Sequence, residues 1–114
     1  MVIGQQWIAR ALVVALLWSM LLGSVAFAAD EAGQKVYQRD CQSCHGRDGT
    51  GNPQLEKTLK ITIPPVTAAA LAPKDDTALL HIIAEGQGKM PGFATKLSAE
   101  AQRQVLNYLK TLGR

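Results

Sequence analysis

Two cysteines and a histidine lie within five consecutive residues, as Cys41, Cys44 and His45. The chain has no other cysteine, so a wider disulfide framework cannot hold its fold together. Closely spaced thiols of this kind serve a redox-active dithiol, a metal site or the covalent attachment of a cofactor. Each of these would fix the chain around one small centre, and the rest of the sequence decides between them.

The rest of the sequence favours covalent haem attachment. A redox-active dithiol belongs near a βαβ unit, and no such pattern is present. A zinc site needs about four ligands, and His81 is the only further candidate beside this motif. In the C-x-x-C-H pattern two thiols bind one haem covalently while the adjoining imidazole binds the iron. We therefore expect one haem c, attached through Cys41 and Cys44, with His45 as the proximal iron ligand.

The N-terminal part of the chain reads as an export leader. Residues 11–29 are uncharged and leucine-rich, and they lie between Arg10 and Asp30. The small-x-small sequence 26–28 predicts cleavage after Ala28, which leaves residues 29–114 as the mature domain. The alternative is an uncleaved membrane anchor, although no basic stop-transfer flank follows. In both cases the folded part lies outside the cytoplasm, in the periplasm or an equivalent compartment.

Length and charge narrow the function classes further. A chain of 114 residues has room for one domain, so no second domain is expected. The net charge of +3 includes Arg10 of the leader, and the basic residues are scattered rather than clustered. A nucleic-acid interface would need a clustered basic patch, so we expect no nucleic-acid partner.

Hydrophobic periodicity predicts an all-α domain. The three helical stretches cover residues 31–40, about 75–85 and about 98–112, with Asp75 or Asp76 and Ser98 as N-cap candidates. Gly86 and Gly113 are the expected stops. No window alternates with period two, so no sheet is expected. Residues 46–73 lack a clear element, and a loop of that length fits a segment wrapped around a cofactor.

The second iron ligand is expected to be Met90. It lies in a loop rich in glycine and proline, where Pro91 restricts Met90 to an extended conformation and the glycines let the backbone approach a flat ring. Core filling is the common role of methionine, but this one is not on an apolar helix face. The competing ligand is His81, which falls within the helical stretch at 75–85, where a surface histidine is commoner.

Taken together, C-x-x-C-H, residues 79–93 with Met90 among them, and Tyr108-Leu109 in the last helix resemble a class I monohaem cytochrome c. The resemblance implies a small helical fold with long loops around one covalent haem. It implies a crossing of the first and last helices at Gly33, Tyr37, Tyr108 and Leu109.

The resemblance also implies that a proline carbonyl, from Pro64 or Pro65, steadies His45. Both tryptophans, Trp7 and Trp18, lie in the leader. The tryptophan that often contacts a haem propionate in this family is therefore missing, which leaves Lys57, Lys60 or backbone groups as candidates.

The expected function is single-electron transfer between redox proteins, a donor and an acceptor, without enzyme activity or a small-molecule substrate. Two strong axial ligands leave no open iron position, and the thioether favours the ferrous state. Two alternatives stay open: a haem subunit fixed in a larger dehydrogenase or reductase, and a gas-sensing or peroxidase haem protein with a labile sixth ligand. Basic side chains could steer an acidic partner or simply be solvated; they are Lys35, Arg39, Lys57, Lys60, Lys89 and Lys96.

Overall fold

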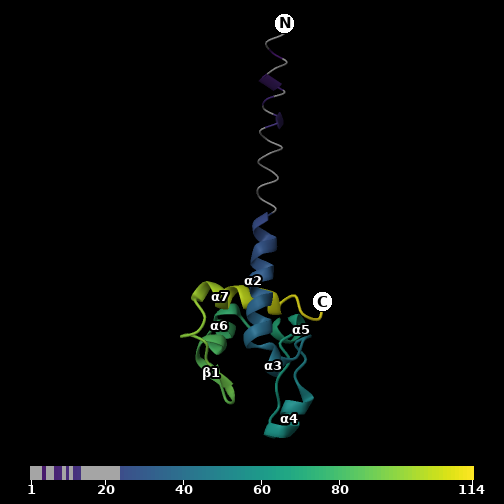
Figure 1. Ribbon diagram of the computed structural model, residues 1–114, viewed down its shortest axis with the longest axis vertical. Coiled ribbons are helices and arrows are strands. Elements are labelled where there is room, and N and C mark those ends of the chain that lie inside the picture. Colours follow the sequence, from purple (N-terminus) through teal and green to yellow (C-terminus); the bar gives the residue numbers. More distant parts are fainter. Residues whose placement is uncertain (1–3, 5–6, 9, 11, 14–23) are drawn as a thin grey trace.

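The structure is a computed structural model that describes residues 4, 7–8, 10, 12–13 and 24–114. Most of the predicted leader, residues 1–28, therefore lies outside the described residues. Within the described part of the chain, no helix combines the length and hydrophobicity needed to cross a bilayer. The domain is mostly helical (Figure 1). The all-α prediction is confirmed.

Three helices carry most of the hydrophobic core. They are α2 (Ser24–Asp40), α6 (Asp76–Glu85) and α7 (Ala99–Leu109). The expected caps are present, because Asp75 accepts a hydrogen bond from Ala78 N at 2.9 Å and Ser98 accepts one from Ala101 N at 3.1 Å. Gly86 ends α6 with a φ of 80°. The helix expected at residues 31–40 is longer than predicted, since α2 begins at Ser24.

The first and last helices cross at close range (Figure 1). A methyl group added at Gly33 would overlap the backbone carbonyl of Gln104, so only glycine lets α2 approach α7 this closely. Next to this point the rings of Tyr37 and Tyr108 lie 5.4 Å apart and tilted by 51°. The buried core continues from Tyr37 through Val105 and Leu106. The predicted crossing is confirmed.

The region between His45 and Pro73 is more ordered than the sequence suggested. It holds α4 (Pro53–Leu59) and α5 (Ala68–Leu71), after the short α3 (Gln42–His45). Asn52 caps α4 by accepting a hydrogen bond from Leu55 N at 3.2 Å. Thr67 caps α5. A helix of one or two turns is too short to leave a periodic pattern, so the prediction of a featureless loop was wrong.

A small hairpin follows α6. Strands β1 (Gly86–Gln87) and β2 (Met90–Pro91) pair antiparallel, with Gly86 opposite Pro91 and Gln87 opposite Met90. The prediction that the domain has no sheet was therefore wrong, because two-residue strands are too short for period-two alternation. The hairpin and α4 project from the end of the domain opposite the start of α2 (Figure 1). They flank the region in which the functional residues meet.

Candidate cofactor site

The C-x-x-C-H segment continues directly from α2. The amide of Cys41 donates to the carbonyl of Tyr37 at 2.9 Å, and the amide of His45 donates to the carbonyl of Cys41 at 3.0 Å. Cys41 is half-buried and Cys44 is exposed, and both are free thiols. Burial raises the pKa of the Cys41 thiol to about 11, with the nearby charge of Asp40 acting in the same direction. The motif thus presents both sulfur atoms on one helical turn.

His45 is held as a neutral imidazole. Burial lowers its pKa, and an interaction with the backbone of Pro64 partly opposes that shift. Its Nδ1 is buried, and it has no hydrogen-bond partner among the described residues. A neutral imidazole is the form that binds a metal. Of the two prolines left open by the sequence, the structure favours Pro64 as the one that acts on His45.

An apolar cavity lies beside this motif. Its empty space is about 570 Å³, open side included. Its lining is almost entirely hydrophobic, with α6 and α7 giving three side chains each and α2 giving Tyr37, and His45 and Met90 both line it. The structure therefore brings Cys41 and His45, from the motif, and Met90, from strand β2, to one cavity.

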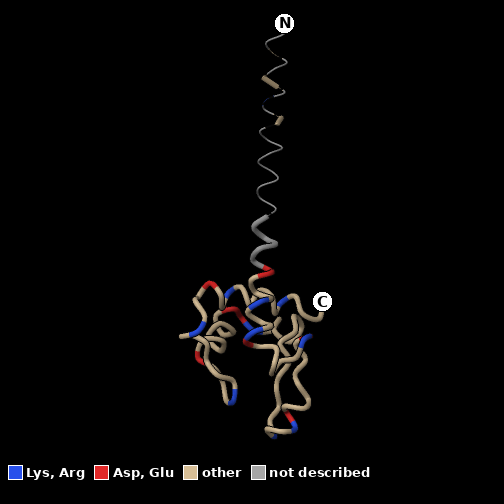
Figure 2. The backbone as a smooth tube through the Cα atoms, viewed as in Figure 1, with Lys and Arg blue, Asp and Glu red and all other residues tan. Residues whose placement is uncertain are grey.

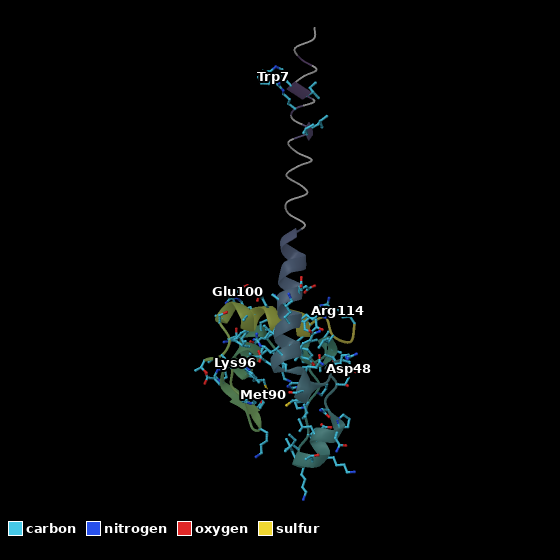
Figure 3. The ribbon with its side chains drawn as sticks, viewed as in Figure 1. Trp7, Asp48, Met90, Lys96, Glu100 and Arg114 are labelled. Carbon is cyan, nitrogen blue, oxygen red and sulfur yellow. The ribbon has the colours of Figure 1, made fainter. Side chains whose placement is uncertain are left out.

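Met90 reaches the cavity from strand β2. The glycines of this segment permit the tight hairpin, because a Cβ at Gly86 would overlap the backbone around Pro91. After the hairpin, the amides of Phe93 and Ala94 donate to the carbonyls of Ile83 and Ala84 at 2.9 and 3.0 Å. These bonds fasten the end of the hairpin to the end of α6. Met90 is half-buried, and Figure 3 shows it facing the middle of the domain.

The competing ligand His81 lies elsewhere. Its side chain is exposed on α6, and it does not line the cavity. This is the surface position that is common for a histidine within a helix. The geometry therefore supports Met90 over His81 as the partner of His45 in a cavity-bound cofactor.

Two hydrogen bonds near the motif were not predicted from the sequence. The hydroxyl of Tyr37 donates to the carbonyl of Gly46 at 2.5 Å, and the amide of Asn52 donates to the carbonyl of Ser43 at 2.8 Å. The first bond supports the residue after His45, and the second supports the segment between the cysteines. The Asn52-Pro53 pair, a common helix start, was the available signal for the second.

The basic residues named from the sequence divide into two groups. Lys35 pairs with Glu31, while Arg39 and Lys96 both pair with Asp40. The other three belong to the projecting elements: Lys57 and Lys60 to α4 and its C-cap, Lys89 to the turn of the hairpin (Figure 2). No charged side chain of the described part of the chain lines the cavity itself. Any carboxylates of a bound group would therefore lie at the open side of the cavity, outside its apolar lining.

Comparison with known proteins decides the family. The family model described as cytochrome c oxidase, cbb3-type, subunit III matches residues 28–109. The chain belongs to the cytochrome c family. It carries covalently bound haem c with its iron, and it takes part in electron transport. The donor set fits this group, because the Cys41 thiol, the His45 imidazole and the Met90 thioether line one apolar cavity, and Cys44 lies exposed on the same turn as Cys41.

Individual relatives within the cytochrome c family differ in size. Cytochrome c55X of Paracoccus denitrificans (strain Pd 1222) is 32% identical over 103 residues, which cover 84% of this chain and 91% of that protein. The subunit CcoP of a cbb3-type cytochrome c oxidase from Azospirillum brasilense is 32% identical over 88 residues, which cover 75% of this chain. This chain spans only 29% of the length of CcoP.

A solved structure confirms the fold. The crystal structure of cytochrome c6C from Synechococcus sp. PCC 7002 superposes with a TM-score of 0.53 and covers 69% of this chain and 90% of that one. At 22% identity the likeness concerns the fold alone. The cytochrome c resemblance noted in the sequence is confirmed by the family match and by the similarity to cytochrome c55X.

Proposed function

We propose that residues 29–114 form a single-electron carrier in which His45 and Met90 are the two axial ligands of the haem iron. The observation that carries the proposal is their presence at one apolar cavity, beside the thiols of the attachment motif. Cys41 and Cys44 are the covalent attachment points in this proposal. Electron donor and acceptor are redox proteins, and no small-molecule substrate is required.

The haem supplies a reversible one-electron couple between ferrous and ferric iron. The protein contributes position and environment. Burial lowers the pKa of His45 and so favours its neutral imidazole, while the backbone of Pro64 partly opposes that shift. The thioether of Met90 would hold the iron together with His45, and with both bound the iron would have no position for a substrate. The apolar walls exclude water, which limits the reorganisation that accompanies each electron transfer.

A second candidate function is that of a haem subunit fixed in a larger complex. The similarity to CcoP, a subunit of an oxidase, favours it. Both candidates use the same iron ligands and differ only in whether the domain leaves its partner. Gentle extraction followed by size-exclusion chromatography separates them. A free carrier elutes as a monomer from the soluble fraction, whereas a subunit co-elutes with its complex.

The proposed location is the periplasm or an equivalent compartment. The leader carries this part of the proposal, since sequence 26–28 has the small-x-small form of a cleavage site and acidic residues follow. Mass spectrometry of the native protein tests it. A mature chain that starts at Ala29 is the expected result, whereas an intact Met1 in the membrane fraction means that the leader is kept as an anchor.

A redox titration of the purified holoprotein tests the carrier function. We expect one equivalent of a one-electron oxidant to convert the ferrous spectrum fully to the ferric one, and one equivalent of reductant to restore it. Turnover of added hydrogen peroxide at a rate well above that of free haem would contradict the proposal. It would indicate an iron position open to substrate.

A further inference from the structure

The carboxylate of Asp40 is buried next to the attachment motif. Its side chain is 0% exposed, although its two partners, Arg39 and Lys96, are 60% and 58% exposed. Arg39 donates to Oδ2 from Nε at 2.9 Å and from Nη2 at 2.6 Å. The ammonium of Lys96 lies 2.5 Å from Oδ1, which has no other partner among the described residues. Lys96 is therefore the counter-charge for one buried oxygen of Asp40.

This ion pair joins two segments that are distant in the sequence. Among the described residues, three of the five ion pairs connect side chains within four residues of each other. The other two are Lys96 with Asp40, and Lys110 with Asp76. The Lys96–Asp40 pair links the residue before Cys41 to the segment that follows Met90.

The position of Lys96 is coupled to that of Met90 through a short turn. The amides of Lys96 and Leu97 donate to the carbonyl of Phe93 at 3.1 and 2.8 Å, and the ammonium of Lys96 lies 6.0 Å from the centroid of the Phe93 ring. Phe93 itself lines the cavity, and only Pro91 and Gly92 separate it from Met90. Figure 3 shows Lys96 and Met90 on the side of the domain that carries the hairpin. Loss of the contact between Lys96 and Asp40 would remove the side-chain restraint on this turn and leave its backbone hydrogen bonds.

We infer that Asp40 and Lys96 are positioning residues that clasp the Met90 segment against the attachment motif and keep Met90 on the iron. The inference rests on the proposed function, since it requires Met90 as a ligand. The hairpin contains Gly86 and Gly88, both with positive φ, and outside its own strand pairing it is tied to α6 by the amides of Phe93 and Ala94. A buried carboxylate retains its cation because little water is present to replace it. The clasp therefore adds a side-chain contact to a segment that is otherwise held by the backbone bonds from Phe93 and Ala94 to α6.

Imidazole binding to the oxidised holoprotein measures how often the sixth position opens. When Met90 must leave first, the apparent affinity for added imidazole is proportional to the open fraction. We expect Lys96→Met to raise this affinity about tenfold, since a pair with a buried partner contributes more than an exposed pair. Lys96→Arg, which keeps the charge, should stay within about twofold of the wild type.

Lys110→Met is the matched control. It removes the other long-range ion pair, Lys110 with Asp76 at 2.5 Å, and lies outside the cavity. Its imidazole affinity should equal that of the wild type, whatever its effect on thermal unfolding. Equal increases in Lys96→Met and Lys110→Met would overturn the inference, because they would reflect general destabilisation.

The variant Met90→Ala distinguishes a failure of the clasp from a failure of the proposed ligation by Met90. Weak binding by the wild type and by Lys96→Met, with strong binding by Met90→Ala, would overturn the clasp and leave the ligation standing. Binding by the wild type as strong as by Met90→Ala would overturn the proposed ligation and the clasp with it. Strong binding by Lys96→Met and weak binding by the wild type is the result that supports both.

Discussion

The phenol of Tyr37 donates a hydrogen bond to the carbonyl of Gly46 at 2.5 Å. Tyr37 is fully buried where α2 meets α7, and Gly46 is the residue directly after His45. The bond therefore connects the helix crossing to the end of the attachment motif. Tyr37, a side chain of the core, thereby fixes the backbone position of the residue that follows His45.

Replacement of Tyr37 by Phe should destabilise the holoprotein by about 1–2 kcal/mol, because the carbonyl of Gly46 loses its donor while the ring stays in place. A fall in the melting temperature by roughly 4–8 °C per kcal/mol is expected for a domain of this size. Thermal unfolding followed by circular dichroism measures it. Tyr108→Phe, which alters the half-buried ring 5.4 Å away, is the matched control and should change the melting temperature less.

The same phenol gives the protein a pH dependence in alkali. Burial raises the pKa of Tyr37 from 10.0 to about 12. Because the raised pKa favours the neutral folded form, its contribution is complete below pH 10 and is lost as the pH rises to about 12. The loss is at most about 3 kcal/mol for a shift of this size. Denaturant unfolding at a series of pH values should show a steeper loss in the wild type than in Tyr37→Phe, and parallel curves would contradict this assignment.

A methyl group at Gly33 should separate the first and last helices. In Gly33→Ala the new Cβ would overlap the backbone carbonyl of Gln104, which cannot rotate away. The overlap outweighs the gain in helix propensity of about 1 kcal/mol, and we expect a net loss of about 2 kcal/mol. Gly88→Ala is the comparison, since the hairpin turn has open space and only a positive φ of 57°. Chemical denaturation of both variants should rank Gly33→Ala as the less stable.

Removal of the cofactor should unfold the domain. The cavity lies among the helices that form the core, and its walls would be left exposed to water without the ring they pack against. Expression of a Cys41→Ser, Cys44→Ser chain without haem attachment, followed by circular dichroism, measures the helix content. We expect most of the helical signal to be lost. Retention of the full signal would mean that the apolar core folds unaided.

The sequence predicted the features that have strong local signals. The caps Asp75 and Ser98, the stop at Gly86 and the close approach at Gly33 are all confirmed, since each depends on one residue type with a specific backbone or capping role. The motif Cys41 to His45 and the loop around Met90 were equally visible. The structure places His45 and Met90 at one cavity and His81 outside it.

The features that the sequence did not predict depend on contacts between distant residues or on very short elements. The burial of Asp40 becomes apparent only when Lys96 is brought beside it by the fold. The roles of Tyr37 and Asn52 depend on which carbonyls lie within reach. The helices α4 and α5 and the hairpin are too short for hydrophobic periodicity to detect them.

Carbon monoxide binding to the reduced holoprotein tests the central proposal, that Met90 is an iron ligand together with His45. Visible spectra are recorded for the wild type, Met90→Ala and His81→Ala. We predict that Met90→Ala binds the gas readily, while the wild type and His81→Ala keep their ferrous spectra. Ready binding by the wild type would contradict the account, because it would show an open iron position and point to gas sensing or catalysis instead of electron transfer.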